Sequence, residues 1–215
     1  MTTARSITGD PTAPLIPLPS HIHDHELCTS CGQPLGYWAI DRLTGVLDRW
    51  GWDTYAPEAL REAHERRQPL ALLLLDLDHF KHVNDRYGHV AGDMVLHAVA
   101  EVLRASVRDE DIVGRYGGHG GDEFLVLLPT TNRDRAMAVA ERVLDGVSDL
   151  EVGVPDVDRG TRTTLTGLTV SIGVALYVPA RGIDPVMEEL VLEADAALLV
   201  AKREGRDTVR IGRPR

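Results

Sequence analysis

A continuous apolar run, Leu70-Ala-Leu-Leu-Leu-Leu75, constrains the fold of this chain more than any other stretch. The run follows Pro69 and ends at Asp76-Leu-Asp78. Its leucine-rich composition would also fit a buried helix. The proline before it and the acids after it favour a strand, and the absence of alternation indicates burial on both faces. We therefore expect a central strand over residues 70–75, with acidic residues at its carboxyl end.

Periodicity places the other elements around this strand. Apolar residues at helical spacing predict helices over about 51–67, 91–107, 133–147 and 186–203, and short strands are expected at 112–116, 124–128, 168–176 and 208–211. Residues 151–164 are polar with Gly and Pro and are expected to form a loop. From residue 70 the order is β-α-β-β-α-β, followed by α-β. The first six elements predict a ferredoxin-like α+β fold, with a mainly antiparallel central sheet flanked by helices.

This topology brings distant carboxylates together. In a split βαβ arrangement the strand at 124–128 lies antiparallel between the strands at 70–75 and 112–116. Asp76 and Asp78 leave the first strand where Asp122 and Glu123 enter its neighbour. Such a cluster is costly unless cations neutralise it, and Mg²⁺ carrying substrate phosphates is the natural solution. The alternative is that one of the two, Asp76 or Asp78, faces solvent and takes no part in the cluster.

A glycine-rich turn precedes the second acidic pair, in Arg115-Tyr-Gly-Gly-His-Gly-Gly-Asp-Glu-Phe124. Glycine lacks Cβ and permits positive φ, so an anionic ligand can approach the backbone closely. Together with the adjacent carboxylates, the turn predicts a phosphate-bearing substrate and a divalent cation. The alternative is an ordinary hairpin with a solvated acidic turn.

Composition narrows the classes of partner. A formal net charge of −10 argues against broad electrostatic binding to nucleic acid or anionic membrane. An acidic protein that handles phosphates must use a few placed cations and metal ions. No segment has the length of a membrane span, and residues 1–20 show no secretory signal, so we expect a cytoplasmic protein.

Residues 1–40 are predicted to form a flexible arm before a domain at 41–215. The arm contains a Cys-x-x-Cys pair followed by Gly, which is the shape of a zinc knuckle. The candidate zinc ligands are Cys28, Cys31, His23 and His25, with His21 nearby. Free thiols in a flexible segment, or a redox pair, are the alternatives.

Several separated motifs now form an ordered set. They are Asp41-x-Leu-Thr-Gly45, Asp76-Leu-Asp-x-Phe-Lys81-x-x-Asn84-Asp85, Gly88-His-x-x-Gly92-Asp93, Gly120-Gly-Asp-Glu-Phe124, Thr169-Val-Ser-Ile-Gly173 and Ala194-Asp-x-Ala-Leu-x-x-Ala-Lys202-x-x-Gly205-Arg206. In type and order this set resembles the GGDEF-domain diguanylate cyclases, over about residues 41–212. The resemblance implies a palm-type nucleotidyl-cyclase domain that condenses two GTP into cyclic di-GMP and two pyrophosphates across a homodimer.

The resemblance also assigns roles to residues. Mg²⁺ (or Mn²⁺) would be held by Asp76, the Leu77 carbonyl, Asp122 and Glu123, and the catalytic residues would be Asp122, Glu123 and Lys81. GTP would be bound by Asn84, Asp93, Lys81, Lys202, Arg206, Gly120 and Gly121. In this assignment Asn84 and Asp93 read the guanine edge. Their structural alternatives are a turn residue and a helix N-cap.

The segment Arg108-Asp-Glu-Asp111 occupies the place of the family's Arg-x-x-Asp product-inhibition site. Arginine can grip a guanine edge and a phosphate at once, so Arg108 and Asp111 are expected to bind cyclic di-GMP. An unremarkable charged loop is the alternative.

One departure from the family pattern affects the expected activity. The usual Arg-aromatic-Gly-Gly-acid-Glu-Phe is lengthened by three residues between Arg115 and Asp122. Either the turn bulges while the flanking strands keep register, or the acids are displaced. A catalytically weak or inactive domain that binds GTP or cyclic di-GMP as a regulatory module is therefore the competing hypothesis.

Overall fold

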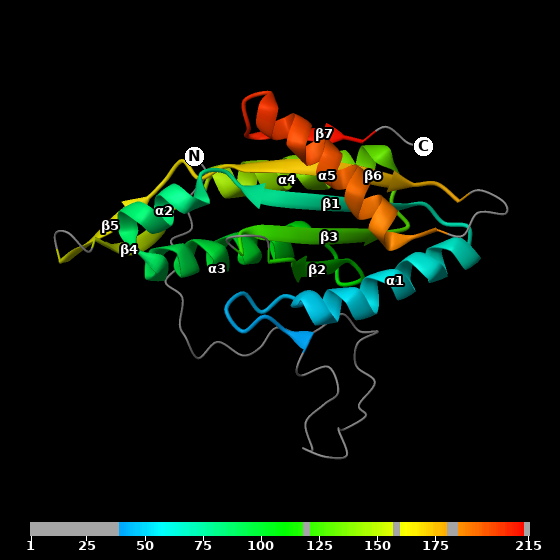
Figure 1. The fold of residues 1–215 in the computed structure, drawn as a ribbon, viewed down its shortest axis with the longest axis horizontal. Coiled ribbons are helices and arrows are strands. Elements are labelled where there is room, and N and C mark those ends of the chain that lie inside the picture. The colour runs from blue at the N-terminus through cyan, green and yellow to red at the C-terminus, as the bar shows by residue number, and fades with distance from the viewer. Residues whose placement is uncertain (1–38, 118–120, 157–159, 180–184, 213–215) are drawn as a thin grey trace, which may run out of the picture.

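The computed structural model describes residues 39–117, 121–156, 160–179 and 185–212, and in these ranges helices cover both faces of a five-stranded sheet (Figure 1). The helices are α1 (Arg49–Glu65), α2 (Phe80–Tyr87), α3 (His89–Ser106), α4 (Arg133–Ser148) and α5 (Met187–Arg203). The strands are β1 (Leu70–Leu77), β2 (Ile112–Arg115), β3 (Glu123–Pro129), β4 (Val152–Asp156), β5 (Thr161–Leu165), β6 (Val170–Tyr177) and β7 (Thr208–Ile211).

The strand order β2-β3-β1-β6-β7 confirms the predicted topology. β3 lies between β2 and β1 and is antiparallel to both, and β6 is antiparallel to β1 on its other side. β7 continues the sheet as an edge strand parallel to β6. β1 is therefore central, as its uninterrupted apolar run predicted.

Two apolar cores lie on the two faces of the sheet. Alternate residues of β1 divide between them, since side chains along a strand point to opposite faces. Ala71, Leu73 and Leu75 pack beneath α3 and α4. Leu70, Leu72 and Leu74 pack beneath α1 and α5. Figure 1 shows α1 and α5 on the face opposite α3 and α4.

The predicted loop at 151–164 is wrong, because β4 and β5 form a separate two-stranded antiparallel hairpin there. Val152, Val154 and Leu165 are buried, so a short apolar alternation inside a polar stretch was missed. The structure also contains α2, which had not been predicted as a helix. This helix has eight residues, of which only Phe80 and Val83 are buried, so the sequence shows too few apolar residues for a helical spacing to be recognised.

The arm at 1–38 lies outside the described residues, and with it Cys28, Cys31, His21, His23 and His25. Among the residues that the structure does describe, no helix combines the length and the apolar character that a membrane span requires.

Candidate active site

Asp76 and Glu123 stand directly opposite each other at the paired ends of β1 and β3. Side chains at opposed positions of an antiparallel pair lie on the same face, with Cβ atoms about 4.5–5.5 Å apart. Asp122 is the next residue back along the chain, and its carbonyl accepts a 3.3 Å hydrogen bond from the Leu77 N–H. Three of the predicted acids therefore meet at this edge of the sheet, as the topology required.

Two basic residues near the end of α5 face these acids. The Lys202 ammonium lies 2.8 Å from Asp76 Oδ2, with both side chains largely covered. Arg206 Nε is 4.0 Å from the buried Asp78. α5 ends at Arg203, so Arg206 stands in the following turn, at φ 68°, and the four-residue spacing is not a helical one. Two basic side chains, Lys202 and Arg206, therefore lie beside the acids at this edge of the sheet.

The charges at this edge are only partly balanced. Burial raises the pKa of the Glu123 carboxyl, and the charges of Asp76 and Asp122 raise it further against the opposing effect of Lys202. Burial also raises the pKa of Asp76, although the Lys202 hydrogen bond lowers it in part. Bringing these acids together in their charged form therefore costs free energy that an added cation would recover.

Asp78 has a different environment, which excludes the solvated alternative for this residue. Its carboxylate is buried and accepts hydrogen bonds from Thr169 Oγ1 at 2.8 Å and Ser171 Oγ at 2.7 Å. A third comes from the Asp207 N–H at 3.1 Å. Asp78 therefore links the end of β1 to β6 and to the segment that follows α5. Its three hydrogen bonds stabilise the fold.

The glycine turn begins and ends in regular strand pairing. Arg115 pairs with Phe124, and the Tyr116 N–H donates to the Glu123 carbonyl at 2.9 Å. The three additional residues therefore fall in the turn that joins these paired positions of β2 and β3. Of the turn residues, Gly118, His119 and Gly120 lie outside the described ranges.

Arg115 fastens this turn to the start of the domain. Its Nε donates to the Gly121 carbonyl at 2.7 Å, and its Nη1 lies 3.2 Å from Asp41. Asp41 in turn accepts hydrogen bonds from the Thr44 N–H and hydroxyl. Gly121 has φ 70°, and a Cβ there would come within 2.7 Å of the Arg115 guanidinium. Glycine is therefore favoured by this backbone conformation, and a larger residue would displace the Arg115 guanidinium.

The predicted guanine-reading residues are brought to neighbouring helices. Asn84 lies on α2 and Asp93 within α3, whose first residue is His89. The N-cap alternative for Asp93 is therefore wrong. A Cβ on Gly92 would lie 2.0 Å from Asn84 Oδ1, so only glycine permits the observed contact between these helices. Lys81 extends from α2 and its ammonium pairs with Asp85 of the same helix at 3.0 Å.

The donor set fits a divalent cation by its chemistry. Asp76, Asp122 and Glu123 supply carboxylates and Leu77 a backbone carbonyl, which are the oxygen ligands that Mg²⁺ and Mn²⁺ prefer. Among the described residues, no group of three or more His, Cys, Asp or Glu side chains is placed so that it could hold a metal ion.

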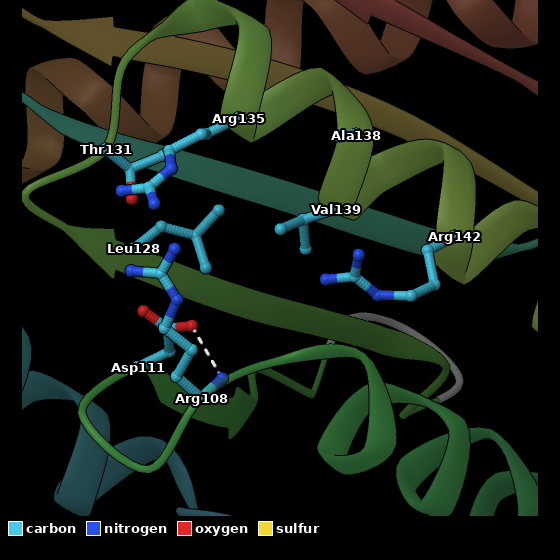
Figure 2. Close-up of a pocket in the computed structure, with 8 residues that line it drawn as sticks. All are labelled: Arg108, Asp111, Leu128, Thr131, Arg135, Ala138, Val139 and Arg142. Carbon is cyan, nitrogen blue, oxygen red and sulfur yellow. Dashed lines mark hydrogen bonds between the residues drawn. The ribbon is translucent and has the colours of Figure 1, made fainter.

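A second site lies between α4 and the loop before β2 (Figure 2). Its lining is Arg108, Asp111, Leu128, Thr131, Arg135, Ala138, Val139 and Arg142. Asp111 Oδ2 accepts from the Arg108 N–H at 2.8 Å, whereas its buried Oδ1 has no hydrogen-bond partner. Burial raises the pKa of Asp111. The predicted pair Arg108 and Asp111 thus shares a pocket with two further arginines.

Sheet order, flanking helices and the acids at the paired strand ends define an α+β domain of the palm type. The family model described as "Diguanylate cyclase, GGDEF domain" matches residues 38–208. The chain belongs to this family.

Two curated relatives show the extent of the similarity. Diguanylate cyclase TpbB of Pseudomonas aeruginosa is 37% identical over 172 residues, which are 80% of this chain and 37% of that protein. Diguanylate cyclase A of Treponema denticola is 36% identical over 155 residues, covering 72% and 38%. The chain thus spans little more than a third of the length of these relatives.

A solved structure agrees with the family assignment. The coiled coil and GGDEF domain of DgcB from Caulobacter crescentus, in complex with c-di-GMP, has a TM-score of 0.72 and 31% identity. The alignment covers 81% of this chain and 86% of that one.

Sequence reasoning missed three features of these sites. Asp78 was expected in the acidic cluster or in solvent, and its burial with hydrogen bonds from Thr169 and Ser171 was not foreseen, although its position beyond Leu77, the last residue of β1, was a signal that its environment would differ. The Arg115–Asp41 pair joins residues too far apart for spacing rules to connect. Arg135 and Arg142 line the second pocket but resemble ordinary solvent-exposed helix residues in the sequence.

Proposed function

We propose that this domain is a diguanylate cyclase, which condenses two GTP molecules into cyclic di-GMP and releases two pyrophosphates. The observation that carries the proposal is the pairing of Asp76 and Glu123 across β1 and β3, with Lys202 above them. Carboxylates for a metal and an ammonium for phosphate are what phosphoryl chemistry needs, because it depends on positioning and charge more than on a protein nucleophile. The names of both curated relatives support the same activity.

In this proposal Asp76, the Leu77 carbonyl, Asp122 and Glu123 hold Mg²⁺ or Mn²⁺ on the triphosphate. The metal, when bound, supplies positive charge to the attacking and leaving oxygens. The raised pKa of Glu123 suits a second task, since a carboxylate of increased basicity can accept the proton of the attacking 3′-hydroxyl.

GTP binding is assigned to residues around this centre. Lys202 and Arg206 would contact the phosphates from the end of α5, and Lys81 would do so from α2 after leaving Asp85. Gly120 and Gly121 would let a phosphate approach the backbone. Asn84 and Asp93 would read guanine, since carboxylate and amide together complement its donor and acceptor edges.

Two GTP molecules must meet for the reaction, so we propose a homodimer in which each subunit holds one nucleotide. Each 3′-hydroxyl then attacks the α-phosphate held by the partner. This makes the rate depend on dimer formation, and the specific activity should fall on dilution. We expect the reaction to take place in the cytoplasm, where GTP is available.

Incubation of the purified chain with GTP and Mg²⁺, followed by chromatography for cyclic di-GMP, tests the activity. The chain should form product, and Asp122→Ala should reduce the rate by at least about 10³-fold, because charge stabilisation in the transition state is lost. Asp134→Ala, a change of the same kind at an exposed position of α4, is the matched control and should leave the rate unchanged. Undiminished turnover by Asp122→Ala would contradict the assignment of the second acidic pair.

A regulatory module that binds GTP or cyclic di-GMP without turnover is the second candidate. The three-residue lengthening of the turn favours it, because a displacement of about 1 Å can cost about 10²-fold in rate. The regular pairing of Arg115 with Phe124 favours the enzyme. Nucleotide binding without product at high protein concentration would decide for the module.

We further propose product inhibition at the pocket of Arg108 and Asp111. The free, buried Oδ1 of Asp111 and the guanidinium groups around it could bind guanine edges and phosphates together. Arg108→Ala should raise the concentration of cyclic di-GMP that halves the rate by at least about tenfold, with the uninhibited rate unchanged. Arg133→Ala, on the same helix as Arg142 but outside the pocket lining, is the control. Equal inhibition of all these proteins would exclude the site.

Zinc binding by Cys28, Cys31, His23 and His25 remains a separate proposal for the arm. Elemental analysis of protein purified without a histidine tag should find about one zinc per chain, and Cys28→Ser should remove it. A metal-free wild-type chain would favour free thiols.

A further inference from the structure

The Lys202–Asp76 pair joins the two sides of the proposed nucleotide site. Asp76 belongs to the sheet, and Lys202 reaches it from the last turn of α5 with its ammonium 2.8 Å from Oδ2. The side chains are 31% and 15% exposed, so this pair is shielded from solvent more than the Lys81–Asp85 pair, at 87% and 60%. Because the Lys202–Asp76 pair is shielded from solvent, dissolved salt screens its charges less than those of an exposed pair.

This contact occupies one of the two carboxylate oxygens of Asp76. Asp76 is a proposed metal ligand, and Lys202 already supplies the positive charge beside it. A metal bound at Asp76 with Lys202 in place would bring two cations together, which repel each other strongly in a partly buried site.

We infer that Lys202 holds the place of the divalent cation in the nucleotide-free domain, so that metal and triphosphate bind together. This inference rests on the proposed function in assigning the metal to Asp76. When GTP arrives, its phosphates give the ammonium a new anionic partner, and Asp76 becomes free to bind the metal. Lys202 is thereby a positioning residue that couples the two ligands.

Arg206 supports this exchange. Its guanidinium is 4.0 Å from Asp78, a long separation for an ion pair, and Asp78 is already satisfied by three donors. Arg206 can therefore turn to the phosphates without leaving a carboxylate unpaired. Lys202, by contrast, leaves a largely covered carboxylate without its ion-pair partner, so its departure has to be coupled to the arrival of a metal.

The test measures Mn²⁺ binding to the full-length chain without nucleotide, by the electron paramagnetic resonance signal of free Mn²⁺. Lys202→Met removes the ammonium and keeps the apolar stem, and Lys202→Gln provides a second neutral side chain. Arg203→Met is the matched control, because it changes the net charge equally at a neighbouring exposed position. Circular dichroism checks that each variant is folded.

Lys202→Met and Lys202→Gln should bind Mn²⁺ at least about fivefold more tightly than the wild-type chain, with Arg203→Met within twofold of it. Adding Asp76→Asn to Lys202→Met should abolish the gain. Unchanged or weaker Mn²⁺ binding in both Lys202 variants would overturn the inference, as would an equal gain in Arg203→Met. A gain in a protein that makes no cyclic di-GMP would refute the proposed function and leave this inference standing.

Discussion

At the scale of single residues, Asp76 and Asp78 are two positions apart and do different work. Asp78 accepts three hydrogen bonds in a buried setting, whereas Asp76 is largely covered and makes an ion pair with Lys202. Removing a buried acceptor leaves its donors without a hydrogen-bond partner, which lowers the free energy of unfolding. Function at Asp76 and stability at Asp78 should therefore separate by mutation.

Asp78→Ala is expected to lower the free energy of unfolding by about 2–4 kcal/mol, because the Thr169 and Ser171 hydroxyls lose their acceptor. Asp76→Ala should cost less than about 1 kcal/mol, since it removes an acid whose charged form is disfavoured. Urea unfolding followed by circular dichroism measures both. Equal costs would show that Asp78 is not the anchor described above.

Glu123 predicts a dependence of stability on pH. Its pKa is raised in the fold, so the folded state binds its proton more tightly than the unfolded chain does. The charged carboxylate therefore destabilises the metal-free fold at pH 7, and this cost disappears as the pH falls through the raised value toward the ordinary one.

Glu123→Gln should accordingly raise the melting temperature of the metal-free protein at pH 7 by about 1–3 °C, and the gain should shrink toward pH 5. Melting curves of both proteins across this range give the comparison. Glu141→Gln, an exposed change on α4, is the control and should show no such trend. A gain that grows on acidification would reverse the sign and contradict the argument.

At the scale of elements, the β2–β3 hairpin carries the additional residues in the turn beyond the Arg115–Phe124 pair. Deleting residues 118–120 restores the usual family spacing and leaves Arg115-Tyr-Gly-Gly-Asp-Glu-Phe. Because Arg115 already pairs with Phe124, we expect the shortened chain to fold and to make cyclic di-GMP at a rate within about tenfold of the full chain. Gain of activity from an inactive parent would show instead that the longer turn displaces the acids.

Gly121→Ala tests the same turn by a substitution beside Asp122 in place of a deletion. An L-residue at φ 70° is strained, and its Cβ would meet the Arg115 guanidinium, so the contact with Asp41 should be disturbed. We expect about 1 kcal/mol of lost stability and at least about tenfold lower turnover. Gly117→Ala shares the positive φ but has open space around its Cβ, so it isolates the backbone effect. Equal losses of stability and turnover in Gly121→Ala and Gly117→Ala would show that the contact with Arg115 does not contribute.

The elements also show how far sequence reasoning extends. The apolar run at 70–75 and the motif spacings were enough to predict β1, the strand order and the meeting of Asp76 with Glu123, because sheet topology has few solutions. The β4–β5 hairpin was missed, since its buried Val152, Val154 and Leu165 lie within a polar stretch. The Arg115–Asp41 and Lys202–Asp76 pairs depend on side-chain placement in three dimensions, which no local pattern encodes.

At the scale of the whole molecule, metal and nucleotide should stabilise the fold together. A ligand at 100 times its dissociation constant adds about 2.7 kcal/mol, which for a domain of this size raises the melting temperature by roughly 5–10 °C. A non-hydrolysable GTP analogue with Mg²⁺ should give such a shift, and either alone a smaller one. An equal shift with the matching ATP analogue would contradict guanine reading by Asn84 and Asp93.

The central claim is that the site at β1 and β3 joins two GTP molecules, and reaction stoichiometry tests it most directly. GTP, cyclic di-GMP and pyrophosphate are quantified together during incubation of the full-length chain with Mg²⁺, alongside Asp122→Ala. We expect two GTP to be consumed and two pyrophosphates to be released for each cyclic di-GMP, with a specific activity that falls on dilution and is lost in the variant. GTP that remains intact at high protein concentration, in a chain that binds it, would contradict the account.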